Sequence, residues 1–333
     1  MAEVESGPTL LITGGDGESE RRPRPDSLHV NGGDGAYSYT RNSYFLVYIS
    51  FKFFIHYLIW GVLLVRIPTN TMQHIIHFIQ QKYSLQCPKS DKTLEFLVFF
   101  NEQPSNDFNT LFKSLPREIP YFAAGVPGSF HCRLFPASSI HFAHCWHAVH
   151  WLSKEPEELL DKNSSAWNKG RIHYTNASDE VVRAYAAQFA KDMDDFLCAR
   201  ATEIVSGGMM VISMLGIPNE MPYSQLAESV MFEFPIYTPS LEDMAETVEK
   251  NGQFSIEILE LINSASLTNG RVDIKAWVVH VRAAMEGMFI QNFSSDIDDE
   301  MFDRLTKKLF MFSERVDSGY KDRNQLLVVL IRK

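Results

Sequence analysis

Residues 178–215 read SDEVVRAYAAQFAKDMDDFLCARATEIVSGGMMVISML and join a long amphipathic pattern to a short apolar run. Ser178 can occupy the N-cap of a helix, and two acids follow it in what would be the first turn. Apolar side chains then recur every three to four residues, which predicts a helix that ends at Gly207 and Gly208. The run 209–215 is almost wholly apolar and predicts a strand buried on both faces.

The chain from residue 71 onward alternates helices and strands in the same manner. Residues 72–82 show helical periodicity, and 216–325 reads as a mainly helical segment that we expect to form a lid. Further strands are predicted at 94–101, 121–124, 139–142 and 326–331. Strands that alternate with long helices predict an α/β fold with a doubly wound sheet covered on both faces.

The composition excludes some partners and favours one compartment. The 333 residues carry 31 Lys and Arg against 41 Asp and Glu, a net charge of −10, so a nucleic-acid partner is not expected. The four cysteines form no CxxC pair, which favours a reducing compartment and a cytoplasmic protein. Residues 1–26 are rich in Gly, Pro and charges, and we expect a disordered tail without a signal peptide.

The segment 44–65 is unusually apolar. As a helix its 22 residues would span roughly 33 Å, which is enough to cross a membrane. Lys52 and His56 oppose this interpretation, because ionisable groups are costly at membrane depth. A membrane helix and a buried run of a globular core both remain open.

Histidines recur every third residue at 141, 144, 147 and 150. Four imidazoles could suggest a zinc site, but a strand that turns into a helix cannot place this spacing on one face. The alternatives are that His150 and Trp151 donate hydrogen bonds in a pocket, or that both are packed polar aromatics. Glu102 follows the predicted strand 94–101, where α/β folds place an acid on ribose hydroxyls.

Several ordered strings extend along most of the chain. They are LHVNGGDG at 28–35, YSYTRNS at 37–43, FNEQPSNDFN at 100–109, GVPGSF at 125–130, HWLS at 150–153, NKG at 168–170 and PIYTPS at 235–240. Together they resemble the plant SABATH methyltransferases, which depend on S-adenosylmethionine. The resemblance implies a Rossmann-like sheet with an α-helical cap over 27–333, a small carboxylic acid as substrate, and a homodimer.

The resemblance also implies roles for individual residues. The cofactor-binding residues would be Tyr39 and Ser43 near the amino-acid end, Asn70, Glu102 on the ribose in place of the family's aspartate, and Ser129 and Phe130 at the adenine. The substrate carboxylate would be held by the catalytic residues His150 and Trp151, with His147 in place of a tyrosine. Some members bind magnesium, for which this chain offers Asn168, the backbone of Phe232, and Glu233 as ligands.

The chain departs from the family's pattern at two places. The family has an acidic, glycine-rich turn after its first strand, whereas residues 64–71 read LVRIPTNT. The cap after residue 216 is also short. These departures leave an alternative to an active enzyme open: an impaired or inactive homologue that acts through dimerisation, or a protein tethered to a membrane through 44–65.

Overall fold

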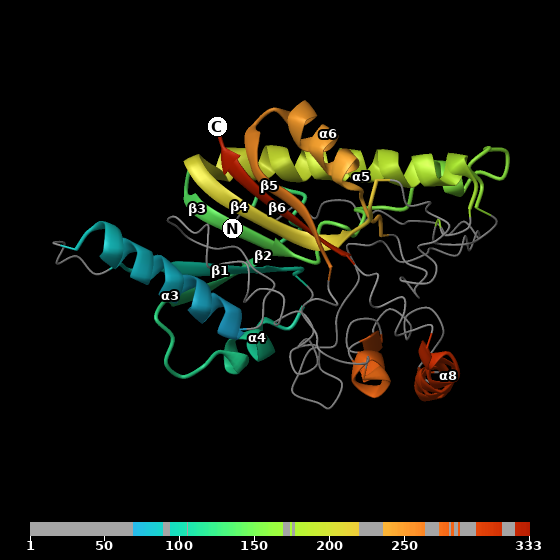
Figure 1. Cartoon of the computed structure of the whole chain (residues 1–333), viewed down its shortest axis with the longest axis horizontal. Coiled ribbons are helices and arrows are strands. Elements are labelled where there is room, and N and C mark those ends of the chain that lie inside the picture. Colours follow the sequence, from blue (N-terminus) through green and yellow to red (C-terminus); the bar gives the residue numbers. More distant parts are fainter. Residues whose placement is uncertain are drawn as a thin grey trace, which may run out of the picture.

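The computed structural model describes residues 69–88, 94–104, 106–168, 174, 177–219, 236–263, 273–279, 281–282, 286, 298–314 and 324–333. Within these residues the chain forms two β-sheets and the helices that pack against them (Figure 1). The predicted tail 1–26 and the apolar segment 44–65 lie outside the described residues. In the part that is described, no helix is both long and apolar enough to cross a membrane.

A long helix leads directly into a central strand of the larger sheet. Helix α5 (Asp179–Glu203) is followed without a loop by β4 (Ile204–Gly216). Ser178 occupies the N-cap position with extended backbone, as predicted, although its side chain makes no capping hydrogen bond. The predicted helix end at Gly207 and Gly208 was wrong, because both glycines lie inside β4. The register against the neighbouring strand shifts there, and Gly207 adopts a φ of +78° that suits a bulge.

The larger sheet has four strands in the order β3-β4-β6-β5. β3 (Ile140–Trp146) runs parallel to β4, and β6 (Asn324–Arg332) runs antiparallel between β4 and β5 (Phe254–Asn263). The strands predicted at 209–215 and 326–331 are confirmed, and the one predicted at 139–142 extends to Trp146. β5 was missed, and it lies within the segment predicted to be mainly helical. Two exposed acids, Glu257 and Glu260, interrupt its apolar pattern.

The smaller sheet pairs β1 (Leu97–Glu102) with β2 (Phe122–Pro127) in parallel, with α4 (Phe108–Ser114) in the connection between them. Both strands were predicted, with small differences in their ends. Among the described residues these two strands do not pair with the larger sheet. The α/β class is therefore confirmed. The sequence predicted one sheet, whereas the described residues form two.

Side chains of β4 alternate between two apolar cores. Met210, Ile212 and Met214 pack with α5 and α6 (Leu241–Asn251), whereas Met209 and Val211 pack with β1 and α3 (Thr69–Gln86). Helices α5 and α6 lie on one side of the sheet and α3 on the other (Figure 1). This two-sided burial is what the uninterrupted apolar run in β4 predicted, because successive strand side chains point to opposite faces.

A third apolar cluster lies in the region predicted to be the cap. It joins α8 (Asp298–Met311) to the helical residues 274–279 and contains Trp277 and Phe302. Figure 1 shows these helices below the sheets, on the side away from α5. The assignment of 216–325 as a cap stays a prediction.

Candidate active site

The carboxyl ends of β1 and β2 bring Glu102 close to the turn that begins at Gly128. The sequence predicted Glu102 directly after the strand, whereas in the structure it is the last residue of β1 and pairs with Pro127. Its backbone carbonyl accepts the N–H of Gly128 at 2.9 Å. Ser129 and Phe130 follow directly, so the predicted ribose and adenine residues converge at one edge of the smaller sheet.

Asn101 fixes the geometry of this turn. Its side-chain amide donates to the carbonyls of both Val126 and Gly128, each at 2.9 Å. Gly128 has a φ of +147°, and a Cβ at this position would lie 2.7 Å from Leu134 Cδ2. The turn therefore favours glycine, because any other residue would be strained at this φ and would displace the end of the Leu134 side chain.

The end of β3 brings together the three residues predicted to hold the substrate. The ring centroid of His150 lies 5.7 Å from that of His147 and 5.9 Å from that of Trp151. His150 is 6% exposed, and its backbone carbonyl accepts the N–H of Tyr237 at 2.9 Å. His147 has a φ of +47°, which places it in the sharp turn that leaves the strand.

A hydrogen-bond chain holds His147 from the larger sheet. Ser213 Oγ lies 3.1 Å from Gln325 Oε1, and Gln325 Nε2 lies 2.9 Å from His147 Nε2. The chain therefore fixes the His147 ring through Nε2.

The other two histidines of the run lie apart from this group. His141 and His144 are both in β3, three residues apart, and so face opposite sides: His141 is exposed and His144 is 1% exposed. Burial lowers the pKa of His144 to about 3, and its ring stacks on Trp146. Among the residues that the structure describes, no group of three or more His, Cys, Asp or Glu side chains is placed to hold a metal ion.

The structure describes only some of the remaining predicted site residues. Asn168 is described and is 6% exposed, but Phe232 and Glu233 lie outside the described residues. Of the three expected magnesium ligands, the structure therefore describes only Asn168. Tyr39 and Ser43 are also outside it, and Asn70 is described only as a backbone position in the first turn of α3.

Sequence reasoning missed three buried charged residues on α5. Asp192, Arg200 and Glu203 are each 2% exposed or less. Asp192 lies three residues after Phe189, a member of the apolar stripe. Arg200 and Glu203 lie four and seven residues after Phe196, another member. A charge at that spacing falls on the buried face of the helix, and this was the signal available. Their hydrogen bonds reach the loops that carry Phe130 and Trp151.

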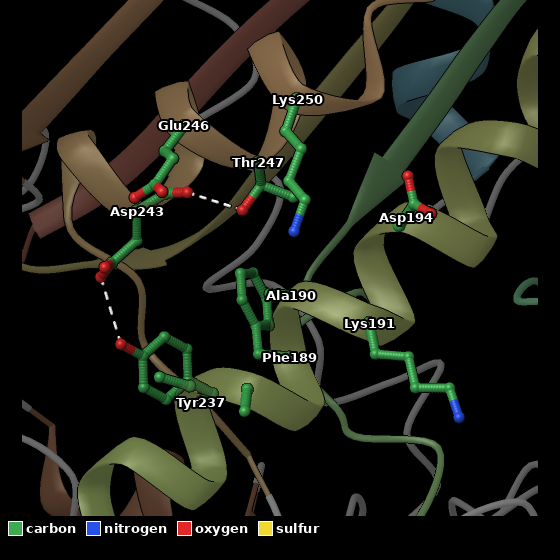
Figure 2. Close-up of a pocket in the computed structure, with 11 residues that line it drawn as sticks. Phe189, Ala190, Lys191, Asp194, Tyr237, Asp243, Glu246, Thr247 and Lys250 are labelled. Atoms are coloured by element: carbon green, nitrogen blue, oxygen red, sulfur yellow. Dashed lines mark hydrogen bonds between the residues drawn. The ribbon is translucent and has the colours of Figure 1, made fainter.

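A cavity of about 460 Å³ lies between α5 and α6, outside the predicted site (Figure 2). Its lining includes Phe189, Tyr237 and charged side chains from both helices, and none of the predicted site residues contributes to it. Tyr237 Oη donates to Asp243 Oδ2 at 3.2 Å across one end of the cavity. The cavity is thus lined by none of the predicted residues at the ends of β1, β2 and β3.

Comparisons with known proteins identify the family to which the chain is similar. The family model for SAM dependent carboxyl methyltransferases matches residues 69–231 and 225–333. The loganic acid O-methyltransferase of Catharanthus roseus is 43% identical over 290 residues, covering 79% of this chain and 76% of that protein. The farnesoic acid carboxyl-O-methyltransferase of Arabidopsis thaliana is 36% identical over 220 residues, covering 59% of this chain and 62% of that protein.

A solved structure extends the similarity to the fold. The structure described as loganic acid methyltransferase with SAH matches with a TM-score of 0.79 and 35% identity, covering 91% of this chain and 98% of that chain. The fold is accordingly the Rossmann-like fold of the S-adenosylmethionine-dependent methyltransferases. With the family model covering most of the chain and a relative above 40% identity, this chain belongs to the family of SAM dependent carboxyl methyltransferases.

Proposed function

We propose that this chain transfers the methyl group of S-adenosylmethionine to the carboxylate of a small organic acid and so forms a methyl ester. The observation that carries the proposal is that the predicted residues stand at or just after the carboxyl ends of three strands. Glu102 ends β1, Ser129 and Phe130 follow β2, and His150 follows β3. In sheets of this type ligands bind at the carboxyl edge.

Two groups of residues are proposed to bind the cofactor. Glu102 accepts hydrogen bonds from the ribose hydroxyls, and Phe130 presents its ring to the adenine beside Ser129. Tyr39, Ser43 and Asn70 are proposed to contact the amino-acid end of the cofactor. When bound, the cofactor supplies a methyl group on a sulfonium, which is electrophilic without further activation.

The substrate side of the site needs to orient an acid rather than to activate it. A carboxylate is already ionised at pH 7, so no general base is required. His150 and Trp151 donate N–H groups that hold the carboxylate and aim one oxygen at the methyl group, and His147 adds a third polar contact. Catalysis would then depend on proximity and orientation in a site from which water is excluded, as the burial of His150 suggests.

Four further properties are proposed. The substrate is expected to be a small carboxylic acid, as the names of the loganic acid and farnesoic acid relatives suggest. None of the four cysteines, all of which the structure describes, forms a disulfide bond, and this supports a cytoplasmic location. A homodimer is expected from the resemblance, and light scattering on the purified protein tests it. Magnesium stays a prediction that calorimetric titration with the ion would test.

Methyl transfer from radiolabelled S-adenosylmethionine to a panel of acids, including loganic acid and farnesoic acid, tests the function. We expect a methyl ester from at least one acid and none from its amide. The variant Trp151→Phe keeps the aromatic ring and removes the donor, so it should lower the rate. No transfer to any acid, despite measured cofactor binding, would favour the inactive homologue.

A further inference from the structure

A buried ion pair on α5 holds the loop that follows β2. Arg200 and Glu203, each with a side chain 1% exposed, pair at 2.7 Å between Nε and Oε2. The Arg200 guanidinium also donates to the carbonyls of Phe130 at 2.9 Å and Cys132 at 3.0 Å. Glu203 Oε1 accepts the backbone N–H groups of Leu134 and Phe135. The pair thus binds the loop 130–135 by four backbone groups.

The ring of Phe130 is held by the same helix. Phe130 meets Phe196 edge-on, with ring centroids 6.2 Å apart, and the Arg200 guanidinium lies 5.4 Å from the centroid of Phe196. Both the backbone and the side chain of the residue proposed to face the adenine are therefore anchored on the last two turns of α5. We call Arg200 and Glu203, with these contacts, the first clamp.

A second buried acid on α5 holds the loop that follows β3. Asp192 is 2% exposed, and its two oxygens accept the N–H of Ser153 at 2.8 Å and the hydroxyl of Ser153 at 2.6 Å. Gln188 Nε2, one turn earlier, donates to the same carboxylate at 2.8 Å. Ser153 lies two residues after Trp151. We call Asp192 and Gln188 the second clamp.

The two clamps share one rigid support. Asp192 and Arg200 are eight residues apart, or about 12 Å along the helix axis at 1.5 Å per residue. The helix between them is fixed against the sheet by Met193, Phe196 and Leu197, all 1% exposed or less. Each clamp serves a different loop, one that follows β2 and one that follows β3.

A contribution to stability alone does not explain charged residues at these positions. Apolar residues of similar volume are often as stabilising as a buried ion pair, because desolvation offsets the attraction of the charges. Apolar residues cannot, however, bind backbone carbonyls and N–H groups of segments that lack regular secondary structure. What the charges add is a fixed position for those backbone groups.

We propose that α5 is the element that sets the cofactor loop and the substrate loop in place, each through its own clamp. Arg200 and Glu203 are positioning residues for the adenine contact at Phe130. Asp192 is a positioning residue for the carboxylate contact at Trp151. The inference rests on the proposed function, since it uses the roles assigned there to Phe130 and Trp151.

Two variants separate the clamps. Arg200→Met/Glu203→Gln leaves no unpaired buried charge and keeps an oxygen for the N–H groups of Leu134 and Phe135, but it removes the donors to Phe130 and Cys132. Asp192→Asn removes one acceptor from Ser153. Asp195→Asn, an exposed acid on the same helix, is the matched control for Asp192→Asn. Arg200→Lys keeps the charge and serves if the double variant does not fold.

Amide hydrogen exchange and calorimetry with S-adenosylhomocysteine give the readouts. The first-clamp variant should raise exchange about tenfold in 130–135 and leave 150–153 within twofold. Its dissociation constant for S-adenosylhomocysteine should rise about tenfold at unchanged stoichiometry. Asp192→Asn should raise amide exchange in 150–153 only, and its dissociation constant for S-adenosylhomocysteine should stay within twofold of that of the unmodified chain. Asp195→Asn should resemble the unmodified chain in both measurements.

The opposite outcomes overturn the inference. A purely structural role predicts that either variant loosens both loops equally, or lowers the binding stoichiometry while the dissociation constant stays the same. Phe130→Ala identifies which proposal has failed. If Phe130→Ala leaves the dissociation constant for S-adenosylhomocysteine unchanged, both the adenine assignment and the inference are wrong. If it raises the constant and the first-clamp variant does not, only the inference is wrong.

Discussion

Asn106 Nδ2 donates a hydrogen bond of 2.6 Å to Glu102 Oε2, four residues earlier in the chain. The contact orients the carboxylate at the end of β1, where the resemblance implies a shorter aspartate. A glutamate has one more rotatable bond to fix, and the amide of Asn106 restricts that freedom. The pair therefore prepares the longer side chain for a ligand at the edge of the sheet.

Glu102→Gln should weaken the binding of S-adenosylhomocysteine by 10- to 100-fold. A neutral amide accepts hydrogen bonds from the ribose hydroxyls less strongly, and a charge-assisted hydrogen bond contributes about 1.5–3 kcal/mol. Asn106→Leu should weaken binding by only a few fold, because the carboxylate is kept but less ordered. Calorimetry measures both, with Glu102→Asp as the control that keeps the charge. Equal affinities for Glu102→Gln and the unmodified chain would contradict the ribose assignment.

His150→Ala should lower kcat/KM for the acid substrate by 10- to 150-fold, with a much smaller effect on stability. The substitution removes an N–H donor to the carboxylate, an interaction of about 1.5–3 kcal/mol. Initial rates and thermal melts on the same preparation check this. Ala148→Gly, nearby in the same turn, is a control for local loosening. A loss of activity that only follows the loss of melting temperature would mean that His150 is part of the core.

His144 should make the fold less stable as the pH falls below about 6.5. Burial lowers its pKa from 6.5 to about 3, so the unfolded chain binds a proton in a range where the folded chain does not. Stability is fully present above pH 6.5 and falls towards pH 3, by at most about 1.4 kcal/mol per unit from this group. Urea denaturation at pH 7.5 and pH 5.5 measures the difference. His144→Gln should reduce that difference, and an unchanged one would exclude His144 as its source.

Replacing 64–68 with an acidic, glycine-rich turn should tighten the binding of S-adenosylhomocysteine by 10- to 150-fold. Arg66 stands where the resemblance implies a turn whose carboxylate receives the cofactor's ammonium, and that hydrogen bond contributes about 1.5–3 kcal/mol. Glycines also let the backbone approach the ligand. A replacement with the same glycines but without the acid separates the two effects in calorimetry. An acidic, glycine-rich replacement that binds no more tightly than the unmodified chain would contradict the prediction.

The sequence by itself determined the class of fold and the order of its main elements. The three-to-four-residue spacing of the stripe on α5 predicted a helix, and the short uninterrupted apolar run in β4 predicted a strand buried on both faces. The predicted site residues could likewise be named, because short motifs carry their residue types in a fixed order. These features are local, and local patterns are recorded in the chain itself.

Other features were decided only by the tertiary structure. The end of α5 at Glu203 depends on pairing between Ile204 and β3, and β5 is recognised as a strand only beside β6. The two clamps join residues 39 to 70 positions apart, a relation that no periodicity expresses. A buried charge is stable only where the fold supplies its partners, so its role could be assigned only after those partners were in place.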